Sequence, residues 1–229
     1  MTAKDEARRA ATRPEGAGRR TAHDEVYQAL RTRLIEGALE PGAALTLRGV
    51  AAELEVSMTP AREAVRRLVA ERALALTASG RILVPVPDHA ALDALFTARR
   101  LLEPELARRA AGTTDDHAAL ADRLRVLDAA TDAAIAAGDV EGYVRANTAF
   151  HAALYATASA PALVALVESV WLQTAPTMRR VYGRMGTGAM HDYHADAIAA
   201  LEQGDTDALV RAIAADVGQG AALAAELSA

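Results

Sequence analysis

Several arginine and hydroxyl side chains are spaced so that they could recognise a nucleic acid. Arg62 and Arg66 lie four residues apart and so share one face of a helix, with Ser57 and Thr59 just before them. The N–H groups at a helix start bind phosphate oxygens, and guanidinium groups bind guanine edges in the major groove. Arg48, in the preceding predicted helix, lies where it could reach the DNA backbone or a base. The set favours DNA binding over the alternative, a solvated basic helix of no special function.

These side chains need a rigid helix to present them, and the sequence predicts three short helices in this region. Asp24 is expected to cap the first helix, which ends at Gly37. The second helix is expected at residues 47–54, and the third begins at Thr59. Pro60 then occupies the first helical position, where its missing N–H costs nothing. The last two helices and their tight connection form a helix-turn-helix.

Two short strands are expected after the third helix, at residues 73–77 and 81–86. Gly80 permits the tight turn between them, and Arg81 is placed to approach the minor groove. A hairpin in this position is the wing of a winged helix-turn-helix, a module that lays one helix in the major groove. Two prolines end the second strand and mark a domain boundary near Asp88.

The composition excludes several other classes of protein. The chain has 229 residues, of which 52% are apolar and only 3% aromatic, so its core must consist mainly of alanine, leucine and valine. It has no cysteine, which excludes disulfides and thiolate metal sites. No stretch approaches about 20 uninterrupted apolar residues, and the N-terminus lacks the apolar segment of a signal peptide, so no membrane contact is expected. We expect a cytoplasmic protein.

The charge is distributed unevenly along the chain. Its net value is −5, but residues 1–87 have 14 basic and 11 acidic side chains, whereas residues 88–229 have 11 and 19. The front of the chain is therefore basic and the rest acidic. This division suggests that only the front meets a polyanion, although surface charge also varies between domains for no functional reason.

Beyond Asp88 the hydrophobic pattern is helical throughout. Glycines at helix ends and Thr or Asp at helix starts divide this half into six helices, expected near residues 88–112, 115–137, 139–158, 160–184, 187–203 and 205–226. Six helices with short connections make a bundle. The predicted fold is mainly α, with a disordered tail at residues 1–22, a winged helix-turn-helix at 23–87 and an all-helical bundle at 88–229.

A second group of polar side chains lies in the helical half. Asn147 and His151 are four residues apart and share a helix face, while His194 and Asp216 lie on the last two predicted helices. Such groups can bind a divalent metal, but spacing alone does not connect the four positions. An isolated histidine on an alanine-rich helix is more often a core or surface residue than a ligand.

Residues 30–86 resemble the N-terminal domain of GntR-type bacterial regulators. The matching motifs are I-E-G-x-L-x-P-G at 35–42, L-x-x-R-x-V-A at 45–51, and V-S-x-T-P-x-R-E-A-x-R-R-L at 56–68, followed by the wing glycine. The resemblance implies that Arg48 and Arg62 contact operator DNA. Met58 stands where the family usually has an arginine that helps to read guanine. A thioether cannot make that bidentate contact, so we expect a different operator or weaker binding.

Residues 92–226 resemble the all-helical FCD effector domain of the FadR subfamily. The matching motifs are R-R-L-L-E-P-E-L-A-R-R-A-A at 99–111, N-T-A-F-H-A-A-L at 147–154 and H-A-D-A-I-A-A-L-E-Q-G-D at 194–205. The resemblance implies a divalent metal held by four side chains, Asn147, His151, His194 and Asp216. At the last of these the family usually has a histidine. Two imidazoles, a carboxylate and an amide suit Zn²⁺, Ni²⁺, Mn²⁺ or Fe²⁺. The alternatives are a metal-free polar pocket, or His191 as a substitute ligand.

The same resemblance places Arg99 in the effector pocket, where a guanidinium can hold a carboxylate by two parallel hydrogen bonds. It therefore implies a small organic acid as effector. The alternative for Arg99 is an ion pair with Glu103, four residues further along the helix.

Together these features predict a ligand-responsive, homodimeric transcription factor, expected to be a repressor, that binds double-stranded operator DNA and is not an enzyme. Two alternatives stay open. Two histidines and a carboxylate also make a non-haem metal site, so the helical half could be a metal-dependent enzyme. It could also serve only to dimerise the DNA-binding domains, with no effector.

Overall fold

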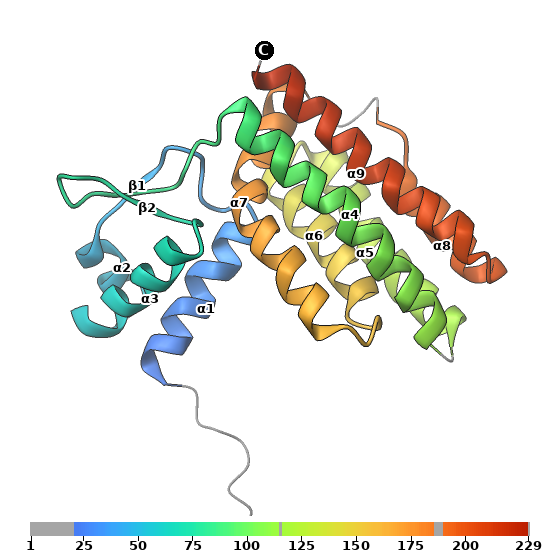
Figure 1. Ribbon diagram of the computed structural model, residues 1–229, viewed down its shortest axis with the longest axis horizontal. Helices are drawn as coiled ribbons and strands as arrows, with labels where there is room; N and C mark the ends of the chain where they lie inside the picture. The colour runs from blue at the N-terminus through green and yellow to red at the C-terminus, as the bar shows by residue number, and fades with distance from the viewer. Residues whose placement is uncertain (1–20, 115, 186–189, 229) are drawn as a thin grey trace, which may run out of the picture.

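The structure, a computed structural model, describes residues 21–114, 116–185 and 190–228. Within these ranges, three helices and three short strands form a small N-terminal unit beside a bundle of six further helices (Figure 1). The mainly α fold and the winged helix-turn-helix are confirmed. The disordered tail predicted at residues 1–22 lies outside the described ranges except for its last two residues.

The first helix, α1 (Ala22–Ile35), begins three residues earlier than a cap at Asp24 predicts. Its N-cap is Thr21, whose hydroxyl accepts from the backbone N–H of Asp24, while the Asp24 carboxylate accepts from the N–H of Thr21. This reciprocal capping box satisfies two N–H groups that the helix cannot pair internally. Asp24 is therefore the third residue of the helix and not its cap.

The helix-turn-helix consists of α2 (Leu47–Glu53) and α3 (Met58–Ala70). α3 begins one residue earlier than predicted, so Pro60 is its third residue; the position is still free of cost because the first four helical N–H groups have no intrahelical partner. The buried face of α3 is Ala61, Ala64, Val65 and Leu68. The opposite face is left exposed to solvent.

Three two-residue strands form one antiparallel sheet in the order β1-β3-β2: β1 (Ala44–Leu45), β2 (Ala75–Leu76) and β3 (Ile82–Leu83). The hairpin strands are shorter than predicted, and β1 was not predicted. β1 has no local strand signal because it pairs with a segment almost forty residues away. At the hairpin tip Gly80 has a φ of +78° and nothing within 4 Å of where a Cβ would lie.

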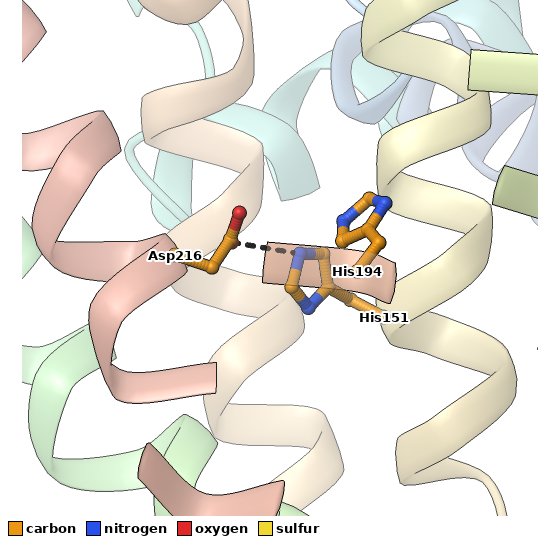
Figure 2. A group of neighbouring side chains, drawn as sticks. All are labelled: His151, His194 and Asp216. Atoms are coloured by element: carbon orange, nitrogen blue, oxygen red, sulfur yellow. Dashed lines mark ion pairs between the residues drawn. The ribbon is translucent and has the colours of Figure 1, made fainter. Parts of the chain in front are cut away.

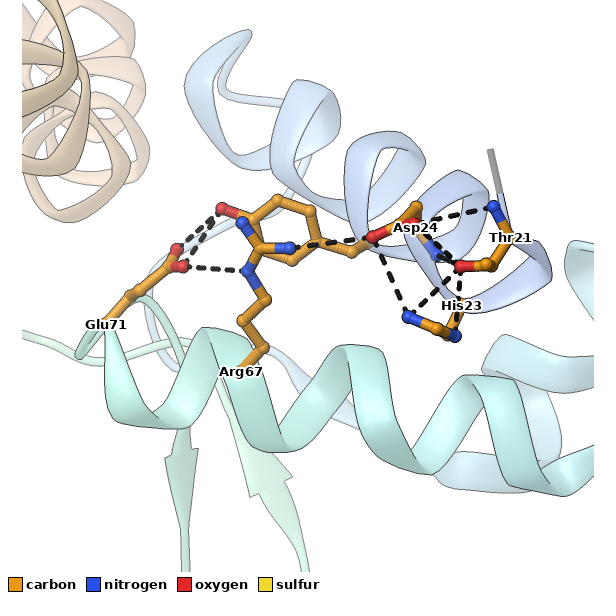
Figure 3. A network of polar contacts seen from close by, with 6 residues as sticks. Thr21, His23, Asp24, Arg67 and Glu71 are labelled. Carbon is orange, nitrogen blue, oxygen red and sulfur yellow. Dashed lines mark hydrogen bonds and ion pairs between the residues drawn. The ribbon is translucent and has the colours of Figure 1, made fainter. Parts of the chain in front are cut away.

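Polar contacts hold α3 against α1 (Figure 3). The hydroxyl of Tyr27 donates to Glu71 at 2.9 Å, and the guanidinium of Arg67 lies 3.6 Å from the centre of the Tyr27 ring. Arg67 also pairs with Glu71 at 3.3 Å and with Asp24 at 3.8 Å. Although Arg67 projects from the same helix as Arg62, its side chain is therefore occupied in fixing the orientation of α3.

The bundle begins at α4 (His89–Thr113), capped by Asp88. The remaining helices are α5 (His117–Ala137), α6 (Val140–Tyr155), α7 (Pro161–Met185), α8 (Tyr193–Gln203) and α9 (Thr206–Ser228). α8 starts later than the predicted residue 187, because Asp192 caps it by accepting from the N–H of Ala195; residues 186–189 lie outside the described ranges.

α9 packs along α4 and α8 in the bundle (Figure 1). Its residues Thr206–Glu226 are long and apolar enough to cross a membrane, judged by length and composition alone. The core helix of a folded bundle passes the same test, so this is weak evidence for a spanning segment. The absence of a membrane partner stays a prediction.

The two units meet where the end of α1 rests on α6 and α7. Arg179 of α7 donates to the carbonyl oxygen of Gly37 at 2.8 Å and to Glu141 at 3.0 Å. Gly37 has a φ of +68°, and a Cβ at this position would lie 3.0 Å from Cγ1 of Val144. The turn after α1 is therefore packed tightly against the bundle.

Gly37→Ala should lower the free energy of unfolding by more than Gly138→Ala. Both glycines have a left-handed φ, but Gly138 has nothing within 4 Å of the position of a Cβ. The Gly138 variant should cost about 1–2 kcal/mol for the backbone conformation, and the Gly37 variant about 1–3 kcal/mol more for the contact with Val144. Urea denaturation of both variants measures the difference. Equal losses would show that the turn is not confined by α6.

Candidate functional site

Three of the predicted ligands converge inside the bundle from three different helices (Figure 2). His151 of α6, His194 of α8 and Asp216 of α9 each offer a donor atom, and these atoms lie within 4.8 Å of one another. Nε2 of His151 is 3.1 Å from Oδ2 of Asp216. Both imidazoles are buried, with side-chain exposures of 2% and 7%. The fold thus joins positions that spacing alone could not connect.

The His194 ring is held by groups outside the predicted set. Its Nδ1 is 3.0 Å from Oδ1 of Asp128 on α5, and its ring stacks on Phe150 with 3.8 Å between centroids. Burial lowers the pKa of His194, but the hydrogen bond with Asp128 and the charge of Asp216 outweigh it and raise the pKa overall. Because a carboxylate accepts the Nδ1 proton, Nε2 faces the cluster with its lone pair.

The His151 ring is oriented by a chain of two hydrogen bonds. The hydroxyl of Tyr155 donates to Oε2 of Glu103 at 2.9 Å, so its oxygen accepts from Nδ1 of His151 at 3.2 Å. The proton of neutral His151 is then on Nδ1 and the lone pair on Nε2. Among the described residues, neither His151 Nε2 nor His194 Nε2 has a hydrogen-bond partner, although both are buried.

Glu103, the acceptor of the hydrogen bond from Tyr155, is fully buried. Its carboxylate accepts hydrogen bonds from Nε of Arg99 at 2.5 Å and from the indole N–H of Trp171 at 3.1 Å, in addition to the one from Tyr155. Burial raises the pKa of Glu103, but the charge and hydrogen bond of Arg99, together with His151 and the hydrogen bond from Trp171, outweigh that effect, and the pKa is lowered. The ion pair considered as the alternative for Arg99 is therefore present, while Arg99 also lines the cavity beside the cluster.

That cavity lies between α4, α6, α7 and α9. It is lined by Arg99, Asn147, His151 and Asp216 together with apolar side chains that include Trp171. The space that it offers to water molecules is about 40 Å³. A water needs roughly 10–15 Å³ of such space. The cavity therefore has room for about three waters or a ligand of a few heavy atoms.

The residues of the cluster fit a divalent transition metal. Burial raises the pKa of Asp216, but the adjacent imidazoles of His151 and His194 outweigh it and lower the pKa to about 2, so the carboxylate is ionised at neutral pH. An ionised carboxylate beside two unpartnered imidazole nitrogens is a donor set that Zn²⁺, Ni²⁺, Mn²⁺ or Fe²⁺ accepts. Asn147 shares the cavity, whereas His191 is bound to Asp196 at 2.7 Å.

The predicted DNA-contacting residues are all exposed on the N-terminal unit: Arg48, Ser57, Thr59, Arg62, Arg66, Gly80 and Arg81. Ser57 is the N-cap of α3, but its hydroxyl makes no capping hydrogen bond and is free for another acceptor or donor. Arg66 pairs with Glu63 at 3.4 Å, a contact between exposed side chains that DNA can replace. Met58 is 38% exposed at the start of the helix, where a base-facing residue belongs.

Sequence reasoning missed the residues that orient the ligands. Tyr155 follows His151 by four residues, a same-face spacing that could have indicated contact. Asp128 lies 66 residues from His194 and carries no local signal. Pairing of Glu103 with Arg99 was considered only as the alternative for Arg99, and the complete burial of Glu103 could not be predicted from a charged residue in a helix.

Comparison with known proteins is consistent over both halves. The family described as "Bacterial regulatory proteins, gntR family" matches residues 22–84, and the FCD domain matches residues 94–219. The chain is 30% identical over 171 residues to the HTH-type transcriptional regulator McbR of Escherichia coli strain K12, covering 74% of this chain and 76% of that protein. It is 32% identical over 74 residues to the gluconate operon transcriptional repressor of Bacillus subtilis strain 168, covering 32% and 30%.

Solved structures agree with these matches. The structure of E. coli McbR/YncC superposes with a TM-score of 0.83 at 26% identity, covering 92% of this chain and all of that one. A GntR-type regulator from Rhodococcus sp. RHA1 gives a TM-score of 0.71 at 25% identity, covering 88% and 96%.

A winged helix-turn-helix joined to a helical domain with an enclosed polar site defines a ligand-responsive, DNA-binding transcriptional regulator. The chain belongs to the GntR family of bacterial regulators, in the group with a C-terminal FCD domain. Its first half binds DNA and its second half binds a small-molecule effector. The proteins and domains it matches are regulators and not enzymes.

Glu103→Ala should lower the free energy of unfolding by about 3–5 kcal/mol, because it leaves the guanidinium of Arg99 buried without a partner. Glu105→Ala on the same helix is the matched control, since the Glu105–Arg109 pair is exposed and should contribute less than about 1 kcal/mol. Urea denaturation gives both values. Similar losses for the two variants would contradict the central role assigned to Glu103.

Proposed function

We propose that the protein is a homodimeric repressor whose helical domain contains a divalent metal and responds to a small carboxylate. The observation that carries this proposal is the pair of buried imidazole nitrogens, His151 Nε2 and His194 Nε2, which have no hydrogen-bond partner among the described residues and converge on the ionised Asp216, 3.1 Å from His151 Nε2. A core with only a structural role would be expected to pair its buried polar atoms. This observation disfavours the alternative in which the helical half only dimerises.

The metal would be held by His151, His194 and Asp216, with Asn147 as the proposed fourth ligand. Asn147 lies one helical turn before His151 and lines the same cavity. Zn²⁺, Ni²⁺, Mn²⁺ and Fe²⁺ remain candidates, because the affinity order of such donors does not identify the occupant in a cell. A bound divalent cation would supply the positive charge and the open coordination positions that an anionic effector needs.

The charges around the cavity support an effector that depends on the metal. Arg99 and Glu103 neutralise each other, which leaves the carboxylate of Asp216 as the net charge when both histidines are neutral. The site without a metal is therefore unfavourable for an anion. Part of the Arg99 guanidinium still lines the cavity and can donate to a carboxylate. The limited space favours an acid of a few heavy atoms.

Residues 23–87 would act as the DNA-binding domain, and residues 88–229 as the effector-binding and dimerisation domain. Two chains would place their α3 helices in major grooves about 34–36 Å apart on a pseudo-palindromic operator. Arg62 and Arg66 face the groove, and Arg81 at the wing reaches the minor groove. The gluconate operon relative is a repressor, which supports the same sign of control here. The protein would work in the cytoplasm, where its DNA is.

Arg62→Ala should weaken binding to a specific operator by about 1–3 kcal/mol, because a base-reading guanidinium is lost. The operator can be obtained by selecting bound duplexes from a randomised pool, and affinities measured by fluorescence anisotropy. Arg123→Ala, which removes an exposed arginine of α5, is the control and should bind as the wild type does. Normal operator binding by the Arg62 variant would mean that α3 does not read DNA as proposed.

Elemental analysis should find about one equivalent of a transition metal per chain in protein purified without chelators. His151→Ala and His194→Ala should each lose it, whereas His89→Ala, at an exposed position of α4, should keep it. The Arg62 variant should also keep its metal, because the two sites lie in different domains. A metal-free wild-type protein would leave the effector to Arg99 and hydrogen bonds alone.

A further inference from the structure

The cluster of proposed metal ligands lies between two cavities. Asp216 lines the cavity that contains Arg99 and also a second cavity between α5, α8 and α9. We call the second cavity the acidic vestibule, after the four carboxylates among its lining residues, Asp128, Asp132, Asp192 and Asp216. Its open volume is about 620 Å³.

The two cavities differ in charge. The first is lined by Arg99 and Asp216, and Glu103 neutralises Arg99, so it has one uncompensated carboxylate. Among the described side chains, which omit residues 184–189, those that line the acidic vestibule include no lysine or arginine, so its four carboxylates are balanced there only by histidines. The carboxylates interact, because burial and the charges of Asp128 and Asp192 raise the pKa of Asp132. A concave surface of one charge sign concentrates counter-ions.

A second observation connects the acidic vestibule to a cation. His194 lines this cavity as well, is only 6% exposed, and its Nε2 has no hydrogen-bond partner among the described residues. A buried imidazole nitrogen that has no hydrogen-bond partner and lies in a cavity lined by carboxylates can serve as a ligand for a metal cation.

We propose that the acidic vestibule is the path by which the divalent cation enters the site, while the carboxylate effector enters from the cavity that contains Arg99. The proposal rests on the metal site proposed above. Its physical basis is electrostatic steering: four carboxylates attract a doubly charged cation and repel an organic acid. The cation and the effector would then reach the cluster from opposite sides.

Asp132 is the residue that isolates this steering role. Asp128 is bound to His194, Asp192 caps α8, and Asp216 belongs to the cluster. Asp132 is exposed on α5, and no hydrogen bond or ion pair joins it to another described residue. Asp132→Asn therefore removes one charge from the acidic vestibule and leaves the fold and the ligands in place.

The chain provides its own reporter for the test. Trp171 is its single tryptophan, and the Trp171 and His151 ring centroids are 6.4 Å apart. Binding of Ni²⁺ to the metal-free full-length protein can thus be followed by stopped-flow fluorescence. Asp122→Asn is the control: it makes the same charge change on α5, ten residues earlier, or about 15 Å along the helix axis, and the pair that it breaks with Arg125 is exposed to solvent.

Asp132→Asn should slow Ni²⁺ association by roughly 3- to 10-fold at low ionic strength and leave dissociation unchanged, because steering acts on encounter. The difference should disappear in about 1 M salt, where the screening length is about 3 Å. Asp122→Asn should associate at the wild-type rate under both conditions.

Three results would overturn the proposal, and they are distinguishable. If the wild type binds no Ni²⁺, the metal site fails and the entry path fails with it. If Ni²⁺ binds, His151→Ala abolishes binding, and both asparagine variants associate at the wild-type rate, the metal site stands but the acidic vestibule does not steer. If Asp132→Asn instead speeds dissociation, Asp132 is a ligand and not a steering charge.

Discussion

A carboxylate without any exposure to solvent, Glu103 of α4, is the constraint on which the rest of the site depends. Its charge has to be balanced inside the bundle, and Arg99 balances it from one turn earlier on the same helix. The remaining acceptor positions are filled by Trp171 of α7 and Tyr155 of α6, so three helices are tied to one group. Because the Tyr155 hydroxyl donates its hydrogen bond to Glu103, its oxygen acts toward His151 as an acceptor. The imidazole is thereby held with Nδ1 toward Tyr155 and Nε2 toward Asp216. A stability requirement of the core thereby sets the tautomer of a proposed metal ligand.

The helix that carries His151 also touches the DNA-binding unit. Val144 of α6 lines the cavity that contains Arg99 and packs against the turn at Gly37, and Thr148 lines the same cavity and donates to the carbonyl oxygen of Ile35 at 3.4 Å. From there α1 leads to α3 through the contacts of Tyr27 with Arg67 and Glu71. This cavity and α3 are thus joined by continuous packing. A typical coupling free energy of about 1–3 kcal/mol between two binding sites changes the affinity at one site by roughly 5- to 150-fold when the other is occupied.

Features with local causes were predictable from the sequence, and features that depend on distant pairing were not. The helices of both halves follow from hydrophobic period and from capping residues, and the recognition helix follows from the alternation of Arg62 and Arg66 with small apolar residues. The N-cap of α1 was misplaced because Asp24 and Thr21 share one capping box, and either could have been the cap. β1, Asp128 and the burial of Glu103 left no trace in local patterns, since each depends on a partner far away in the chain. The four proposed metal ligands came from resemblance, and the structure brings the two histidines and Asp216 together.

The central proposal is that the bundle holds a metal where α6, α8 and α9 meet. Anomalous diffraction from crystals of the protein as purified tests this most directly, with data collected on both sides of the absorption edge of the metal present. The account predicts one anomalous peak within bonding distance of His151 Nε2, His194 Nε2 and the carboxylate of Asp216. A peak elsewhere, or no peak while both imidazole nitrogens remain without a partner, would contradict it.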